Sequence, residues 1–265
     1  MGLQEERIEP SLPVNVSIRN VKKTFSILFA GEKKQITADV TITVSINGIR
    51  GAHISRLVEA LHSASSEDTL ENIGKKIISY LENNHPVSNY IRVRIKFTTT
   101  IAYHSAITDS IEEFPINVVF SMEKKENIQT YHYEFTLSTM TACPNMIALN
   151  GKLTHTQRGL TSIIVETKQP INFEKLIKKC LSIVFPTHPL LKISHEKKLV
   201  KAVCESPAFS EDIIRKVAYE IAKLPLPDDA IIQVRHTSQE SIHPFDIVAE
   251  GHWYLKEIRE KIEKR

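Results

Sequence analysis

The sequence predicts an α+β fold in which antiparallel strands carry paired helices on one face. Residues 38–46 and 91–97 alternate between apolar and polar side chains, a pattern typical of strands with one buried face. Residues 54–61 and 70–81 carry apolar side chains at helical spacing, as amphipathic helices do. Because half-buried strands flank these helices, we expect an antiparallel sheet that is covered on one face.

The first half of the chain is predicted to contain two strands, two helices and two further strands. The strands are residues 14–30, 38–46, 91–97 and 115–122. Asp68 and Glu71 form a capping-box pattern at the start of the second helix.

The second half is predicted to repeat this order. Its strands are residues 130–138, 160–167, 229–236 and 245–251, and its helices are residues 173–181 and 213–221. The second of these helices follows Ser210. The segment from Ser194 to Lys198 is predicted to be irregular, and the charged C-terminal residues are predicted to form a solvated helix.

This repetition predicts a single bimodular domain over residues 1–265. The first module covers about 14–123, the second about 129–251, and a C-terminal helix covers 253–264.

Composition and charge exclude several classes of protein. The formal net charge of +3 is too small for the broad basic surface of a nucleic-acid-binding protein. No apolar run approaches the roughly 20 residues that span a bilayer, and residues 1–13 lack the apolar core of a signal peptide. Three irregularly spaced cysteines, Cys143, Cys180 and Cys204, argue against a disulfide framework. We expect a soluble, cytoplasmic protein that binds neither nucleic acid nor membrane.

The loop at residues 48–53 contains two glycines between the second strand and the first helix. With Arg50 and Arg56 close by, its backbone N–H groups could bind an anion at the helix N-terminus. Glycines in turns need no ligand, so both interpretations stay open.

Cys143 and His155 combine a thiol and an imidazole twelve positions apart, at the end of one predicted strand and the start of the next. Zn and Fe(II) prefer such ligands, which a metal site gathers from separate segments. A lone cysteine is more often a small buried hydrophobe, so the spacing leaves both interpretations open.

Three later stretches contain acidic residues. Glu196 lies in the predicted irregular segment, and Glu211 lies in the first turn of a helix, where acids are favoured without any function. Glu240 and His243 lie three residues apart before the last strand, and such a pair can donate and accept protons. Each stretch can equally be solvated.

Five segments, taken in order, carry a resemblance to a known family. They are residues 51–56 (Gly-Ala-His-Ile-Ser-Arg), 141–144 (Thr-Ala-Cys-Pro), 155–158 (His-Thr-Gln-Arg), 207–212 with Arg215, and 240–243 (Glu-Ser-Ile-His). Together they resemble the type IB GTP cyclohydrolases, which include the archaeal enzyme of methanopterin synthesis and the bacterial folate-pathway form. The resemblance extends from about residue 14 to residue 251. It implies the tunnelling fold and a homotetramer with active sites at subunit interfaces.

The resemblance also implies one divalent metal ion per subunit, Fe(II) in the cell with Zn or Mn as alternatives. Its ligands fall on Cys143, His155 and Glu196. Many members continue the Cys-Pro motif with Cys or His, whereas Asn145 follows Pro144 here. A second ligand in this turn is therefore not implied.

The family's guanine-binding glutamate falls on Glu211. An ionised carboxylate can accept two hydrogen bonds, which match the adjacent N1–H and 2-amino donors of guanine. For the triphosphate we expect basic side chains, with Arg56, Arg158 and Lys152 as candidates and His53 as a phosphate or ribose contact.

The implied reaction is hydrolysis at C8 of the guanine of GTP, with release of formate and reclosure to a 7,8-dihydroneopterin phosphate in pterin biosynthesis. The product is either the 2′,3′-cyclic phosphate or the triphosphate. His243 is our candidate for the acid and Glu240 for the residue that orients it, although these roles can be exchanged. The alternative is a non-catalytic tunnelling-fold protein that binds a purine or pterin or serves as a structural oligomer.

Overall fold

The structure is a computed structural model that describes residues 3–64, 68–85, 88–188 and 191–264. It contains two compact units. The first comprises Met1–Thr98, Val119–His132 and Lys168–Pro170, and the second comprises Thr99–Val118, Tyr133–Thr167 and Ile171–Arg265. Both units contain residues from three long strands. These strands are β3 (Tyr90–Ser105), β4 (Ser110–Lys125) and β5 (Ile128–Ala142). The division of the sequence into two consecutive modules stays a prediction.

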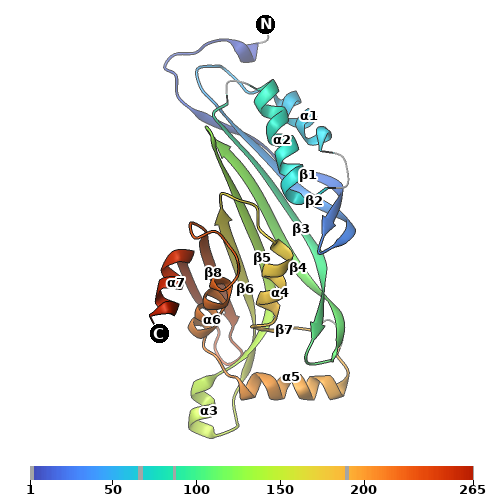
Figure 1. Cartoon of the computed structure of the whole chain (residues 1–265), viewed down its shortest axis with the longest axis vertical. Helices are drawn as coiled ribbons and strands as arrows, with labels where there is room; N and C mark the ends of the chain where they lie inside the picture. The colour runs from blue at the N-terminus through green and yellow to red at the C-terminus, as the bar shows by residue number, and fades with distance from the viewer. Residues whose placement is uncertain (1–2, 65–67, 86–87, 189–190, 265) are drawn as a thin grey trace. The chain divides into compact units, whose positions relative to one another are not determined.

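The first unit is built on a long antiparallel hairpin (Figure 1). The hairpin consists of β1 (Val14–Phe29) and β2 (Glu32–Ile46). The unit also contains the short 3-10 helix η1 (Leu3–Glu5), α1 (Ile54–Ser63) and α2 (Leu70–Asn84). β1 pairs with β2 from Val14 opposite Ile46 to Phe29 opposite Glu32, and β2 pairs with β3. The predicted order of two strands, two helices and two strands is confirmed for this half of the chain.

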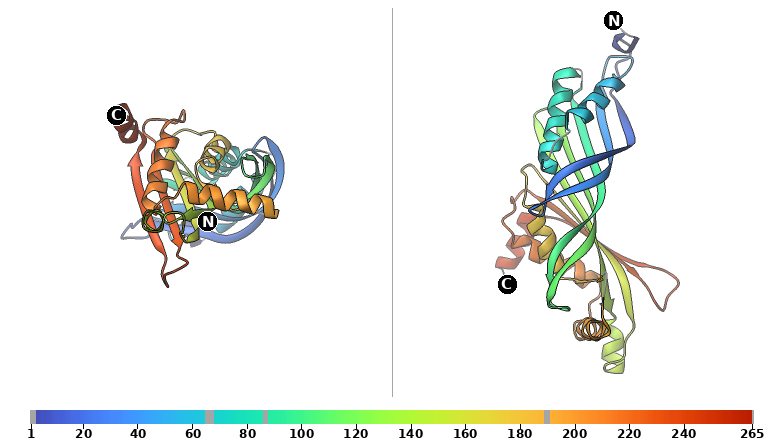
Figure 2. Two further views of the ribbon diagram at one scale, coloured as in Figure 1. Left: turned by 90° about the horizontal axis from the view of Figure 1, so that it is seen from below. Right: turned by 90° about the vertical axis from the view of Figure 1, so that its right-hand side faces the viewer.

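The predicted apolar face of α2 is buried, whereas that of α1 is buried only in part, because Ile54 and Val58 are exposed. Leu57 and Leu61 of α1, and Ile73, Ile77 and Leu81 of α2, are buried. The two helices lie side by side in both Figure 1 and Figure 2. The spacing of apolar residues therefore predicts both helices correctly, but for α1 it predicts a wider buried face than the structure has.

The start of α2 differs from the predicted capping box. Thr69 is the N-cap residue, and its hydroxyl accepts the backbone N–H of Asn72 at 3.3 Å. Asp68 lies one residue earlier and pairs with Lys76 at 2.8 Å. The hydrogen bond from Lys76 is the main cause that lowers the pKa of Asp68 below its usual range. The predicted cap was therefore one residue too early, because a threonine hydroxyl already occupies the capping position.

In the loop at residues 48–53, the backbone N–H groups of Arg50 and Gly51 are already bonded. The N–H of Arg50 donates to the carbonyl of Glu6 at 2.9 Å, and the N–H of Gly51 donates to the carbonyl of Gln4 at 3.2 Å. The Arg50 guanidinium also pairs with the Glu6 carboxylate at 2.6 Å. These contacts favour the structural interpretation of the loop over an anion site.

The second unit holds the remaining elements, which run from α3 to α7. They are α3 (Pro144–Asn150), β6 (Thr156–Thr167), α4 (Phe173–Leu181), β7 (Phe185–Pro186), α5 (Ile193–Glu205), α6 (Ser210–Ala222), β8 (Ile231–Gln239), β9 (Ile247–Tyr254) and α7 (Leu255–Glu263). Hydrogen bonds link the strands in the order β1-β2-β3-β4-β5-β6-β8-β9, and β7 pairs with β5. β6 pairs with β8 so that Thr161 lies opposite His236.

The C-terminal helix α7 is not simply solvated as predicted. Leu255 and Ile258 are buried, and Arg259 donates to the carbonyls of Ala222 and Leu224 at 3.0 and 2.7 Å. α6 and α7 lie on the same side of β8 and β9 (Figures 1 and 2). The helix has a narrow apolar stripe that its many charges conceal in the sequence.

The segment from Ser194 to Lys198 is not irregular but forms the first turns of α5. Of this helix, Leu199 and Val203 are the buried residues, and they pack with Ala142 at the end of β5. Two buried positions give too weak a helical period to be seen in the sequence. The second half of the chain therefore contains α3 and α5 in addition to the predicted pair of helices.

Within the residues that the structure describes, no helix is long and apolar enough to cross a membrane. All three cysteines are free thiols. Burial raises the pKa of the Cys180 thiol, which makes this thiol unreactive and leaves it as part of the core.

Candidate active site

Cys143 and His155 meet at the two ends of the connection between β5 and β6. The N–H of Cys143 donates to the carbonyl of His155 at 3.2 Å. The Thr154 hydroxyl donates to the carbonyl of Cys143 at 2.9 Å. Pro144 follows at the first position of α3, where its missing N–H is tolerated. Both Cys143 and His155 are partly exposed, so their side chains are accessible to a ligand.

These two residues line a pocket of about 190 Å³ in the second unit. The lining residues are Cys143, Pro144, His155, Gln157, Ala208, Phe209, Ser210, Glu211, Glu240, His243 and Ile247. The N–H of Ala208 donates to the carbonyl of Ala142 at 3.3 Å, which places the start of α6 beside the end of β5. The structure thus brings together five of the ten predicted site residues.

Glu211 lies in the first turn of α6 and is exposed. The capping role in this turn falls to Asp212, whose side chain accepts the N–H of Phe209 at 3.2 Å. Asp212 also pairs with Arg215 at 3.1 Å. Capping therefore does not explain Glu211, which faces the pocket instead.

Glu240 and His243 lie in the loop between β8 and β9. The Ser238 hydroxyl donates to Glu240 Oε1 at 2.7 Å. The ring of His243 stacks on Phe245, with ring centroids 5.0 Å apart and an angle of 6° between the ring planes. Ser241, from the same loop, has its hydroxyl 3.3 Å from Nδ1 of His155. The loop therefore contributes to the pocket both directly and through the orientation of His155.

The donor chemistry at Cys143 and His155 fits a divalent metal ion, but the expected third ligand lies elsewhere. Ser241 contacts Nδ1 of His155, and an imidazole held at one nitrogen presents the other to a metal. Glu196, however, is exposed on α5 and does not line the pocket. Among the described residues, no three His, Cys, Asp or Glu side chains are grouped closely enough to hold an ion.

The four residues predicted to bind phosphate or ribose lie outside this pocket lining. Arg158 is exposed and donates to Gln239 Oε1 at 3.3 Å, and Lys152 is exposed in the turn after α3. His53 and Arg56 belong to the first unit. There they lie 3.4 and 4.0 Å from the Glu5 carboxylate.

Gln157 also lines the pocket, although it was not among the predicted site residues. It is the second residue of β6, and His155 comes directly before this strand. The predicted strand began at residue 160, so no strand alternation pointed to Gln157. Phe209 and Ser241 come from loops, where no such period applies.

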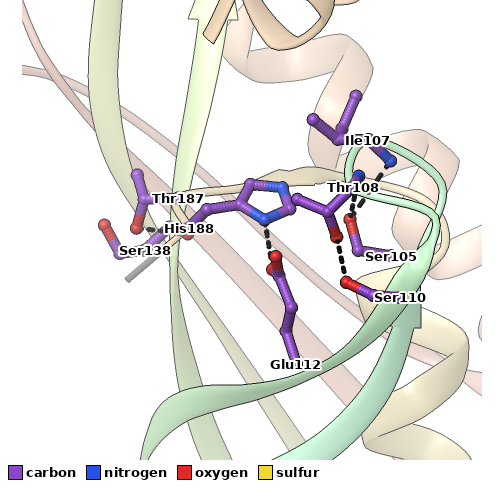
Figure 3. Close-up of polar contacts among 8 residues, drawn as sticks. All are labelled: Ser105, Ile107, Thr108, Ser110, Glu112, Ser138, Thr187 and His188. Carbon is purple, nitrogen blue, oxygen red and sulfur yellow. Dashed lines mark hydrogen bonds and ion pairs between the residues drawn. The ribbon is translucent and has the colours of Figure 1, made fainter. Parts of the chain in front are cut away.

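A second polar cluster of the second unit lies near the turn between β3 and β4 (Figure 3). The side chain of His188 is 1% exposed, and its Nδ1 lies 2.5 Å from Oε2 of Glu112. The His188 ring packs edge-on against Phe114 at 5.1 Å. Beside it, Thr187 donates its N–H to the carbonyl of Ser138 at 2.9 Å. We interpret this cluster as an anchor for the chain between β7 and α5, because its residues do not line the pocket.

Comparison with known structures identifies the fold. A uricase from Arthrobacter globiformis superimposes with a TM-score of 0.56 at 10% identity, covering 91% of this chain and 93% of that chain. A uricase from Bacillus fastidious gives a TM-score of 0.51 at 7% identity, covering 94% and 95%. Likeness at these identities concerns the fold alone, and it confirms the predicted tunnelling fold.

Comparison of sequences identifies the family. The chain is 30% identical to the GTP cyclohydrolase MptA of Thermococcus kodakarensis, over 93% of this chain and 97% of the relative. It is 28% identical to the GTP cyclohydrolase FolE2 of Dictyoglomus thermophilum, over 91% and 93%. The family described as type I GTP cyclohydrolase folE2 matches residues 3–249. The chain therefore belongs to the type I GTP cyclohydrolase folE2 family.

Proposed function

We propose that this protein is a metal-dependent GTP cyclohydrolase. It would hydrolyse C8 of the guanine of GTP, release formate and form a 7,8-dihydroneopterin phosphate in pterin biosynthesis. One observation carries the proposal: Cys143, His155, Glu211, Glu240 and His243, from four separate segments of the chain, line one pocket. Membership of the family supports GTP as the substrate.

Glu211 would select the base. Its carboxylate lies in the first turn of α6 and lines the pocket. The ionised group accepts two hydrogen bonds, from N1–H and the 2-amino group of guanine. Adenine has no such pair of donors, so the same carboxylate would reject it.

Cys143 and His155 would hold the metal ion, Fe(II) in the cell or Zn or Mn in its place. When bound, such an ion would supply Lewis acidity, which lowers the pKa of water toward about 7. Ser241 contributes by holding Nδ1 of His155, so that Nε2 is presented to the ion. The assignment of Glu196 as third ligand stays a prediction.

His243 would supply the proton and Glu240 would orient it. Attack at C8 requires a proton on the imidazole nitrogen of guanine, and a histidine side chain can serve as the general acid that donates it. The stacked Phe245 limits the orientations of the His243 ring, and Ser238 holds the Glu240 carboxylate.

For the phosphate groups, Arg158 and Lys152 stay candidates from the second unit and Arg56 and His53 from the first. We further propose a homotetramer in the cytoplasm. Its location is supported by three free cysteines, since disulfides are rare in that compartment.

Metal analysis of anaerobically purified protein, combined with pterin fluorescence after addition of GTP, tests the proposal. Cys143→Ala should lose metal and turnover together, whereas Glu211→Ala should keep its metal and lose GTP binding. Cys204→Ala is the matched control, because this partly buried thiol lies on α5 outside the pocket lining.

Two outcomes would count against this division of roles. Equal loss of metal from the Cys143 and Glu211 variants would contradict it. Stoichiometric metal and GTP binding without pterin would favour the non-catalytic purine-binding alternative. The mass of the product would distinguish the cyclic phosphate from the triphosphate.

A further inference from the structure

A row of buried polar side chains lies on β5, β6 and β8, next to Gln157 of the pocket. Thr139 is 1% exposed, and Thr161 and His236 are 0% exposed. Oγ1 of Thr139 lies 3.2 Å from Oγ1 of Thr161, which lies 2.9 Å from Nδ1 of His236. At the other end, the Thr139 hydroxyl donates to the carbonyl of Gly159 at 3.4 Å. The proposed reaction gives these residues no role.

The direction of this hydrogen-bond chain is set at the Gly159 carbonyl, because a carbonyl oxygen accepts and never donates. Thr139 gives its single hydroxyl hydrogen to that carbonyl and must therefore accept from Thr161. Thr161 has then used its own hydrogen and must accept from Nδ1 of His236. The neutral His236 ring is thus held as the Nδ1–H tautomer, and its Nε2 is an unprotonated lone pair.

Several features keep Nε2 of His236 buried and unprotonated. Burial lowers the pKa of His236 to about 4, so the ring is neutral near pH 7. The ring lies against Gly159, where an added Cβ would be 2.5 Å from Cε1 and 2.8 Å from Nε2. Nε2 is buried and has no hydrogen-bond partner among the described residues. A buried acceptor left without a hydrogen bond destabilises the protein, because it has lost its contact with water.

The neighbouring position on β6 carries a second buried acceptor of this kind. Gln157, Gly159 and Thr161 alternate along β6, so they share one face of the strand. Oε1 of Gln157 is buried without a partner in the described part of the chain. The same carboxamide carries two N–H donors. A half-turn about its last side-chain bond exchanges the positions of oxygen and nitrogen.

We propose that His236 is a positioning residue for the pocket: its Nε2 accepts an N–H of the Gln157 carboxamide and so directs the Gln157 oxygen into the pocket. One half-turn then satisfies both buried groups, because the oxygen faces ligand donors and the lone pair receives a hydrogen. The ligand donor would be an N–H of the purine. This role deepens the proposed function and rests on it for the identity of the ligand.

Two substitutions at His236 separate its two nitrogens. His236→Gln carries an amide oxygen at about the distance of Nε2 and keeps the acceptor. His236→Asn reaches only as far as Nδ1, so it keeps a donor to Thr161 and loses the acceptor. Loss of one neutral hydrogen bond corresponds to roughly a 3- to 10-fold weaker interaction. We expect His236→Asn to raise KM for GTP by about that factor with little change in kcat, and His236→Gln to stay near the wild type.

A double-mutant cycle tests whether His236 acts through Gln157. Gln157→Leu alone should raise KM about as much as His236→Asn, and the double variant should be no worse than either single variant. If the increases in KM of the two single variants instead multiplied in the double variant, the two residues would act independently and the proposal would be overturned. So would equal KM values for the Asn and Gln variants of His236.

A measurement on the wild-type protein separates this inference from the proposed function. Nitrogen NMR of histidine-labelled protein should show Nδ1 protonated and Nε2 unprotonated for His236, with the Nε2 signal alone shifting in Gln157→Leu. The opposite tautomer, or an Nε2 signal that ignores Gln157, would overturn the positioning role. Failure of the wild type to form pterin from GTP would instead overturn the proposed function and leave the NMR result unchanged.

Discussion

Acidification from about pH 7 to about pH 5 should destabilise the protein through His236. The side chain is 0% exposed, and burial lowers its pKa from 6.5 to about 4. The unfolded chain therefore binds a proton as the pH falls below about 6.5, whereas the folded protein does not bind it until about pH 4. The contribution of His236 to the free energy of unfolding is fully present above the pKa that this histidine has in the unfolded chain. It is lost as the pH falls toward the lower pKa of the folded protein. The proton-binding difference amounts to about 2 kcal/mol between these two pH values.

Urea unfolding of the wild type and of His236→Gln at both pH values measures this contribution. Glutamine does not titrate, so the variant should lose about 2 kcal/mol less on acidification than the wild type does. The contributions of the other titrating groups are the same in both proteins and cancel in the comparison. One of these groups is His85, whose pKa is also lowered by burial. Equal losses in the two proteins would refute the conclusion that His236 is buried in its neutral form.

Three further predictions concern single substitutions. Gly159→Ala should reduce the free energy of unfolding by about 1–3 kcal/mol, because the new methyl group would meet the His236 ring at 2.5 Å; a wild-type urea midpoint would show that the ring is free to move. Thr69→Ala should cost about 1 kcal/mol by removing the N-cap hydrogen bond of α2, and unchanged thermal unfolding would contradict that role. Glu196→Ala should lower the metal content without loss of fold, since the residue is exposed; full metal content would exclude it as a ligand.

The first half of the fold was predictable because its buried faces are wide and regular. Val40, Ile42 and Val44 on β2 are 0–1% exposed, and each alternates with a polar neighbour. Ile73 and Ile77 of α2 are likewise buried. Patterns of period two and period three to four appear in a sequence when burial is this one-sided.

The second half was harder to predict because several of its elements depend on contacts distant in sequence. β7 is two residues long and exists through its pairing with Thr139 and Met140 of β5. α5 buries Leu199 and Val203 against Ala142. Neither element has a local pattern strong enough to identify it.

The candidate site was predictable where its residues belong to quoted motifs. Cys143, His155 and Glu211 lie on one pocket as expected. The position of Glu196 was not predictable, because it depends on the orientation of α5. His236 follows Ile232 and Val234 in the buried alternation of β8, so the sequence shows it as one more core position. Its role depends on the pairing of β6 with β8, which no local pattern reveals.

The most direct test of the central claim follows the fate of C8. The protein, reconstituted with Fe(II) under anaerobic conditions, is incubated with GTP isotopically labelled at C8, and the label is traced by NMR. We expect one labelled formate for each GTP consumed, with an unlabelled pterin as the other product. Retention of the label in the purine ring, with GTP bound at the pocket, would contradict the assignment of cyclohydrolase activity.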